Sequence, residues 1–297
     1  MSVRLQMGAV EWGLLLLLSV IWGASFLFGR IAVQELPPMT LVLLRVALAA
    51  VAINLWLAWR GGYRGERPWA GLAVLGLVNN VIPFGLIFLG QVEIGAALAA
   101  IVNALTPVWS MLFAHWATAD ERLSANRVGG VVISLAGVAV LIGTSALTGL
   151  SAAAWAQVAV LGATLSYGLA TVWGRRFAAL PPAETARGQL TMSTLLMVPI
   201  ALVVDRPWTL SMPSGTVWVS VLLLAVVCTA FAYILYFTIL QRAGAVNAAL
   251  VTLLIPPSAT LMGIVFLGET LAPHQFAGMG LILAGLVVID GRLLRRS

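Results

Sequence analysis

The segment LAAIVNALTPVWSMLFAHWATADERLSANRVGGVVISLAG, residues 98–137, decides the fold of this chain because it occurs twice. Its second copy, NAALVTLLIPPSATLMGIVFLGETLAPHQFAGMGLILAG, spans residues 247–285. Pro107 and Pro256 lie 149 residues apart in the two copies, each inside a long apolar run. Other matching pairs lie 148 residues apart: Glu121 with Glu269, Gly130 with Gly278, and Gly137 with Gly285. The duplication predicts a protein made of two structural repeats.

The composition indicates a membrane protein. The 297 residues are 61% hydrophobic and 9% charged, with a mean hydropathy of +1.05. Soluble domains carry a charge on about a quarter of their residues, so the composition excludes that class. The net charge of +6 comes from arginines between apolar segments, which favours anchoring at a membrane surface over binding to nucleic acid. The single cysteine, Cys228, rules out an intramolecular disulfide framework.

Ten apolar segments are long enough to cross the hydrocarbon core of a bilayer, which is roughly 30 Å thick and needs about 20 residues. They span residues 12–32, 38–59, 69–89, 93–115, 124–143, 153–174, 184–204, 216–240, 244–267 and 274–293. The first run continues without a cleavage site, so we interpret it as a retained span. The predicted fold class is an all-α polytopic membrane protein with ten transmembrane helices.

The positions of the arginines predict how these segments are oriented. With the N-terminus inside the cell, the inner loops contain most arginines, and the outer loops contain only Arg30 and Arg206. This bias predicts cytoplasmic N- and C-termini in a bacterial plasma (inner) membrane. Because each copy contributes five spans, an odd number, the second copy must cross in the opposite direction. We expect repeats at residues 1–146 and 147–297, inverted around a central cavity, an arrangement typical of transporters.

Polar and aromatic residues near the middle of six spans predict the substrate site, since a polar side chain in the bilayer core needs a partner or water. The candidate substrate-binding residues are Trp22, Ser25, Asn79, Asn80, Phe84, Asn103, Tyr167, Cys228, Tyr233 and Thr252. Two alternatives stay open: hydroxyl groups that bond back to their own helix, and asparagines that join helices without a ligand. The polar residues of the seventh span, Thr191, Ser193 and Thr194, have no assigned role.

Four prolines are candidates for helix breaks or gating positions: Pro83, Pro107, Pro256 and Pro257. A proline inside a helix removes a backbone donor, and the carbonyl that loses its partner can bind a substrate or water. A kink without any ligand is the alternative interpretation of each proline.

The ionisable residues limit the kind of substrate. All ten acidic residues lie at or near the ends of spans. Arg45, about two turns into the second span, is expected to reach outward to Glu35 or to carbonyl groups in a structural role. His115 is the only titratable candidate for proton coupling, with an interfacial structural role as the alternative. An uncharged cavity of aromatic and amide groups suits a small neutral amphiphile such as a neutral amino acid, and no metal ion, cofactor or nucleic acid is expected.

Small residues recur on neighbouring turns of the fifth and tenth spans, and such residues allow helices to approach closely. They are Gly129, Gly130, Ser134 and Gly137 in the fifth span, and Gly278, Gly280, Ala284 and Gly285 in the tenth. We expect these two spans to contact each other within one chain, with a dimer seam as the alternative. The expected state is a monomer or a weak homodimer embedded in membrane lipid.

The run Trp22-Gly23-Ala24-Ser25-Phe26, followed by Arg30, Pro37 and Arg45, resembles the opening of the EamA repeat of the drug/metabolite transporter superfamily. Pro256, the run Leu267-Gly268-Glu269-Thr270-Leu271, Gln275 and Gly278 resemble the close of its second copy. The resemblance covers essentially the whole chain and implies ten helices in a basket-like arrangement, cytoplasmic termini and usually efflux. The chain is most similar to bacterial amino-acid exporters of the YddG type, which implies aromatic and other neutral amino acids as substrates. In the first copy, Ala119-Asp120-Glu121 departs from the Leu-Gly-Glu of the second.

Together these features favour an exporter of neutral amino acids that works by alternating access and is not an enzyme. A drug exporter, or an exporter of another metabolite such as a purine, is the main alternative within the same superfamily. A channel or a scaffold is a further alternative. An intramembrane enzyme is disfavoured because Cys228 has no evident catalytic partner, and His115 and His274 fall on opposite sides of the membrane.

Overall fold

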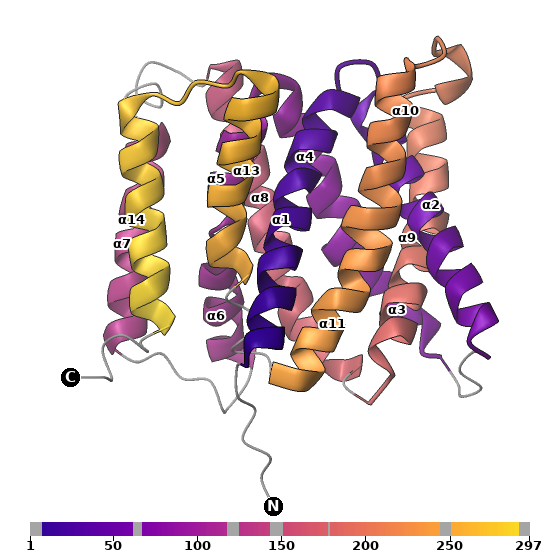
Figure 1. Cartoon of the computed structure of the whole chain (residues 1–297), viewed down its shortest axis with the longest axis horizontal. Coiled ribbons are helices and arrows are strands. Elements are labelled where there is room, and N and C mark those ends of the chain that lie inside the picture. Colours follow the sequence, from indigo (N-terminus) through magenta and orange to yellow (C-terminus); the bar gives the residue numbers. More distant parts are fainter. Residues whose placement is uncertain are drawn as a thin grey trace, which may run out of the picture.

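The computed structural model describes residues 8–61, 67–117, 125–142, 151–177, 179–243 and 251–290, and every regular element within these ranges is a helix. The helices stand side by side along one common direction (Figure 1). Helix α1 (Ala9–Ala32) begins at the end of the bundle where α14 (Pro273–Asp290) ends. We call this end the terminal face, and the end that carries residues 33–37 the opposite face.

The helices confirm the predicted ten spans. Seven helical stretches are long and apolar enough to cross a membrane, and three shorter apolar helices accompany them among the described residues. The remaining elements are α2 (Pro38–Trp59), α3 (Trp69–Gly76), η1 (Leu77–Val81), α4 (Ile82–Glu93), α5 (Ala96–Asn103), α6 (Thr106–Ala117), α7 (Ala125–Ile142), α8 (Ala152–Gly174), η3 (Arg175–Phe177), α9 (Pro182–Val204), η4 (Pro207–Thr209), α10 (Gly215–Leu222), η5 (Leu223–Phe231), α11 (Ala232–Ala243) and α13 (Val251–Leu267). The start of the predicted ninth span, residues 244–250, and Glu121 lie outside the described residues.

Local sequence signals account for where several helices begin. Pro38, Pro182 and Pro273 are the first residues of α2, α9 and α14, where proline loses no hydrogen bond and its fixed φ suits a helix. Ser151 caps α8, with its Oγ accepting a hydrogen bond from the Ala154 N–H at 3.2 Å. Ser214 caps α10 in the same way, accepting from the Val217 N–H at 3.4 Å. These start signals are local, which is why the span boundaries could be predicted closely.

The third and eighth spans, which are repeat mates, both contain a π-helical segment at mid-length. Segment η1 interrupts the third span between α3 and α4, and η5 interrupts the eighth between α10 and α11. A π-helical turn widens the helix and rotates the following side chains, and it is frequent at functional sites. Here η1 carries Asn79 and Asn80, and η5 carries Cys228 and Thr229. Nothing in the sequence pattern predicted this change of helical winding.

The prolines behave differently in the two repeats. In the first, α5 ends at Asn103 and α6 begins at Thr106, so the helix is interrupted just before Pro107. In the second, α13 continues through Pro256 and Pro257, so the prediction of a break there is wrong. Membrane helices tolerate interior proline where neighbouring helices, hydroxyl side chains or local adjustments satisfy the freed backbone groups. Pro83 is the second residue of α4, which continues directly from η1, so the chain stays helical there.

Helices α7 and α14 pack against each other at one side of the bundle (Figure 1). A Cβ atom added to Gly137 would lie 2.9 Å from the carbonyl oxygen of Gly278, and one added to Gly285 would lie 2.6 Å from that of Gly130. Backbones this close leave no room for a side chain, as expected for small residues at a helix contact within a membrane. The predicted contact between the fifth and tenth spans within one chain is therefore confirmed.

Candidate functional site

A central cavity of about 360 Å³ lies between the two repeats. Nine of the ten predicted binding residues line it: Trp22, Ser25, Asn79, Phe84, Asn103, Tyr167, Cys228, Tyr233 and Thr252. Pro107 and Pro256 also line it, whereas Pro83 and Pro257 are not among the lining residues. The volume falls in the range of small-molecule sites, which runs from about 300 to 1,000 Å³. Residues predicted from mid-depth polarity in both repeats thus line one common cavity.

Asn80 is the exception, and its surroundings explain why. Its side chain is 0% exposed, donates from Nδ2 to Ser193 Oγ at 2.9 Å, and accepts from the Tyr233 hydroxyl at 2.8 Å. Adjacent residues of a helix point in different directions, so Asn79 reaches the cavity while Asn80 points between helices. Asn80 therefore joins η1 to α9 and α11, as the packing alternative proposed.

The seventh span, whose polar residues had no assigned role, forms hydrogen bonds with the third. Gln189 of α9 lines the cavity, and its Oε1 accepts from Asn79 Nδ2 at 2.9 Å. Ser193, one turn further along α9, accepts from Asn80. Thr191 faces α2, where its Oγ1 accepts from Asn54 Nδ2 at 3.4 Å. Gln189 is a cavity residue that sequence reasoning missed, because its position near the start of the span suggested an interfacial location.

Arg45 does not reach outward, so that prediction is wrong. The side chain is 6% exposed and lines the cavity, with its Nε donating to Thr229 Oγ1 at 3.0 Å. The guanidinium carbon lies 3.7 Å from the centre of the Phe84 ring, a distance typical of a cation–π contact. The expected partner, Glu35, instead accepts from the backbone N–H and hydroxyl of Ser214 at 2.6 and 2.7 Å. The cavity therefore contains a positive charge, contrary to the prediction of an uncharged site.

Aromatic side chains form much of the remaining wall. The rings of Trp22 and Tyr236 lie 5.5 Å apart at an angle of 38°, joining α1 to α11. Phe26, Phe84 and Phe88 add apolar surface from α1 and α4, and Tyr167 adds an aromatic ring from α8. Tyr236 was missed by the sequence argument, although it follows the predicted cavity residue Tyr233 within one helical turn, and Thr229 lies next to Cys228 in the polar set of the eighth span. His115, the candidate for proton coupling, does not line the cavity.

The opposite face is held together by Glu269, which follows α13. Its carboxylate accepts hydrogen bonds from the backbone N–H groups of Ala96 and Ala97, at 2.6 and 2.9 Å, at the start of α5. A carboxylate at a helix N-terminus satisfies unpaired donors and is attracted by the helix dipole. A Cβ atom added to Gly95 would lie 2.5 Å from the Glu269 carboxyl carbon, so only glycine allows this approach. The contact thus joins the C-terminal end of α13 to the N-terminal end of α5.

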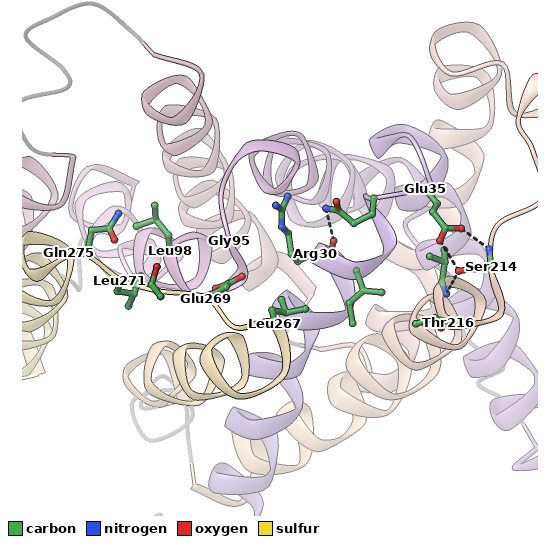
Figure 2. Close-up of a pocket in the computed structure, with 14 residues that line it drawn as sticks. Arg30, Glu35, Gly95, Leu98, Ser214, Thr216, Leu267, Glu269, Leu271 and Gln275 are labelled. Atoms are coloured by element: carbon green, nitrogen blue, oxygen red, sulfur yellow. Dashed lines mark hydrogen bonds between the residues drawn. The ribbon is translucent and has the colours of Figure 1, made fainter.

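A second pocket, of about 500 Å³, lies at this face. Figure 2 shows Glu269 beside Gly95 at one part of this pocket and Glu35, bonded to Ser214, at another, with Arg30 between them. Arg30 donates from Nη1 to the carbonyl oxygens of Gln91 and Val92, the latter at 2.9 Å. These polar contacts connect α1, α4, α5, α10 and α13 on the opposite face.

Toward the terminal face, the central cavity extends to side chains that are open to the surroundings. Thr171 of α8 lines the cavity and is exposed, and its Oγ1 accepts from Ser110 Oγ of α6 at 3.1 Å. Both residues lie on the terminal-face side of Pro107 and Tyr167 in their helices. The two ends of the cavity therefore differ: polar contacts join the helices on the opposite face, whereas Thr171 on the terminal-face side is exposed.

Comparison with known proteins identifies the family of this chain. The model of a family described as the EamA-like transporter family matches residues 11–143 and 154–290, once in each half of the chain. This chain belongs to the EamA-like transporter family. The resemblance seen in the motifs around Trp22 and Glu269 is thereby confirmed, and so is the assignment to a family of multi-pass membrane transporters. The exact repeat boundaries, at residues 146 and 147, stay a prediction.

Relatives of this EamA-like transporter extend over nearly its whole length. A Salmonella typhimurium protein described as a probable amino-acid metabolite efflux pump is 28% identical over 96% of each chain. An uncharacterized inner membrane transporter of Escherichia coli, YedA, is 24% identical over 94% of this chain and 90% of its own length. A solved crystal structure with 21% identity matches 97% of this chain and 98% of its own, with a TM-score of 0.68, and supports the fold alone.

Proposed function

We propose that this EamA-like transporter exports neutral amino acids, aromatic ones included, across a bacterial inner membrane by alternating access. The single observation behind the proposal is the central cavity of about 360 Å³, whose aromatic walls and amide groups come from both repeats. Aromatic surface suits an apolar side chain, and a few polar groups suit the charged ends of an amino acid. The efflux relative from Salmonella typhimurium adds support by its description.

In this proposal the terminal face is cytoplasmic, as the distribution of arginines predicts. Substrate enters past Thr171 while the Glu269 contact keeps the opposite face closed. The two repeats then exchange conformations, so that the opposite face opens and the terminal face closes.

Counterflow in proteoliposomes tests this function. Vesicles containing the purified protein and unlabelled L-phenylalanine are diluted into labelled L-phenylalanine, and we expect transient accumulation of label. Ala100→Phe fills the cavity from a position with no exposed surface and is expected to abolish counterflow. Gly280→Phe is the matched control, because a side chain at Gly280 meets open space, and its counterflow is expected to persist.

The result also separates the alternatives. If no neutral amino acid shows counterflow, the substrate proposal fails, and amphiphilic drugs and purines become the next substrates to measure. If label equilibrates without stimulation by internal substrate, the protein acts as a channel. A scaffold would give no flux with any solute.

A further inference from the structure

Arg45 is a cation buried in the central cavity without an acidic partner among the described residues. Only its Nε has a hydrogen-bond partner there, the hydroxyl of Thr229 at 3.0 Å. The titratable groups that interact with it electrostatically are Tyr167, Tyr233 and Cys228, none of which is a carboxylate. Burying an unpaired charge is costly, so proteins rarely retain one unless an anion binds to it.

The surroundings of Arg45 fix its guanidinium and leave part of it available. Thr229 holds Nε, and the Phe84 ring covers the guanidinium at 3.7 Å. Phe88 lies at 5.8 Å on the same helix, α4. A guanidinium has five N–H donors, and the four on Nη1 and Nη2 form a planar fork that matches a carboxylate. The side chain is thus oriented before any substrate arrives, which lowers the entropy lost on binding.

Asn103 offers a complementary group in the same cavity. It is the last residue of α5, at the break before Pro107, and it lines the cavity. Its Oδ1 is buried and accepts no hydrogen bond from the residues that the structure describes. A buried acceptor of this kind is normally satisfied, so an N–H donor on a ligand would complete it.

We propose that Arg45 binds the carboxylate of the transported substrate and Asn103 binds its ammonium group, so that the cavity selects α-amino carboxylates. The inference rests on the proposed transport function and deepens it by assigning the two ends of the substrate. The amino-acid side chain then lies against the aromatic wall formed by Trp22 and Tyr236. Arg45 and Asn103 belong to the first repeat, and the ring of Tyr236 belongs to the second, so substrate contacts both halves.

A carboxylate is favoured over a phosphate by the number of charges. Arg45 is the only charged side chain among the described residues that line the cavity. One guanidinium neutralises one carboxylate, whereas a phosphate monoester carries nearly two negative charges and would leave one of them unpaired and buried.

Competition against phenylalanine counterflow tests the assignment in the unmodified protein. L-phenylalaninamide and phenethylamine lack the carboxylate, and we expect them to inhibit about 10- to 100-fold more weakly than L-phenylalanine, since they lose a charge-assisted pair. 3-Phenylpropionate lacks only the ammonium and is expected to lose about 10-fold. Phenyl phosphate is expected to inhibit weakly, and inhibition stronger than that of phenylalanine would overturn the choice of a carboxylate.

Variants then test which residue causes the preference for phenylalanine over each analogue. In Arg45→Gln, we expect the preference for phenylalanine over its amide to fall to near unity, and Arg45→Lys is expected to keep part of it. Asn103→Leu should remove the preference for phenylalanine over 3-phenylpropionate and leave the preference over the amide. Arg187→Gln is the matched control: Arg187 donates to Asn54 Oδ1 at 2.6 Å, does not line the cavity, and should leave both preferences unchanged.

The outcomes separate this inference from the transport proposal. If phenylalanine is transported but its amide competes equally well, or Arg45→Gln keeps the preference, the role of Arg45 is refuted while the function stands. If phenylalanine is not transported, binding of 3-phenylpropionate and phenethylamine is measured by tryptophan fluorescence of the purified protein. Binding of the carboxylate alone, lost in Arg45→Gln, would support the role of Arg45 although the amino-acid function fails. If the protein binds neither 3-phenylpropionate nor phenethylamine, both proposals are refuted. If Arg45→Gln does not fold, the competition by the substrate analogues on the unmodified protein tests the role of Arg45.

Discussion

Glu269 is predicted to control how often the opposite face opens. In Glu269→Gln the neutral amide keeps one oxygen acceptor, so one of the two bonds to Ala96 and Ala97 is lost together with the negative charge. A hydrogen bond to a charged group contributes about 1.5–3 kcal/mol, and a charge at a helix N-terminus about 0.3–1 kcal/mol. The closed state should therefore lose about 2–4 kcal/mol, and the ratio of open to closed molecules should rise roughly 30- to 700-fold.

A cysteine in the cavity can report this change. Cys228→Ala removes the only cysteine, and Ala100→Cys introduces one at a fully buried position that lines the cavity. In the proposed orientation the opposite face lies outside the cell. A membrane-impermeant thiol reagent applied to intact cells then reaches this position only when that face opens. We expect Glu269→Gln to increase the labelling rate by the same factor as the open population.

Thr270→Ala is the matched control, since Thr270 is the next residue in the same loop and lines the same pocket on the opposite face. Its labelling rate should stay at that of the background protein. Equal rates in the Gln and Ala variants would refute the role of the Glu269 contact. Rapid labelling of the background protein would refute the closure of the opposite face itself.

Three further predictions concern packing and pH. Gly285→Ala places a Cβ atom 2.2 Å from Ser134 Oγ, so we expect a loss of about 1–3 kcal/mol and a lower melting temperature in detergent, whereas Gly280→Ala should have little effect. Asn80→Ala removes the acceptor of the Tyr233 hydroxyl and should cost about 1–3 kcal/mol of stability without changing the phenylalanine-to-amide preference in competition assays. Hydrogen bonds from the Ser214 backbone N–H and hydroxyl lower the pKa of Glu35 below its ordinary 4.5. The stability from this contact is thus present above pH 4.5 and lost as the pH falls through the lower folded pKa, and pH-dependent melting of Glu35→Gln should lack this loss.

The sequence by itself determined the spans, the two repeats and much of the polar lining of the cavity. Hydropathy is a local property of the sequence, and in a bilayer a long apolar run satisfies its backbone hydrogen bonds by forming a helix. The predicted span boundaries therefore lie close to the observed helix ends. The duplication then related Asn103 to Thr252 and Pro107 to Pro256, and all four line the cavity. Mid-depth polarity was informative because such residues seek a partner or water, which the cavity supplies.

Only the tertiary structure decided how individual side chains use that framework. Asn79 and Asn80 are equivalent in polarity, yet one lines the cavity and the other joins helices, because the rotation of each helix depends on its neighbours. Arg45 could extend outward or inward from α2, and the position of Thr229, 184 residues away, together with the Phe84 ring, selects the inward direction. Similarly, Glu269 finds its partners at Ala96 and Ala97 only because α13 packs beside α5. These contacts join residues distant in sequence, and the charge of the cavity depends on them.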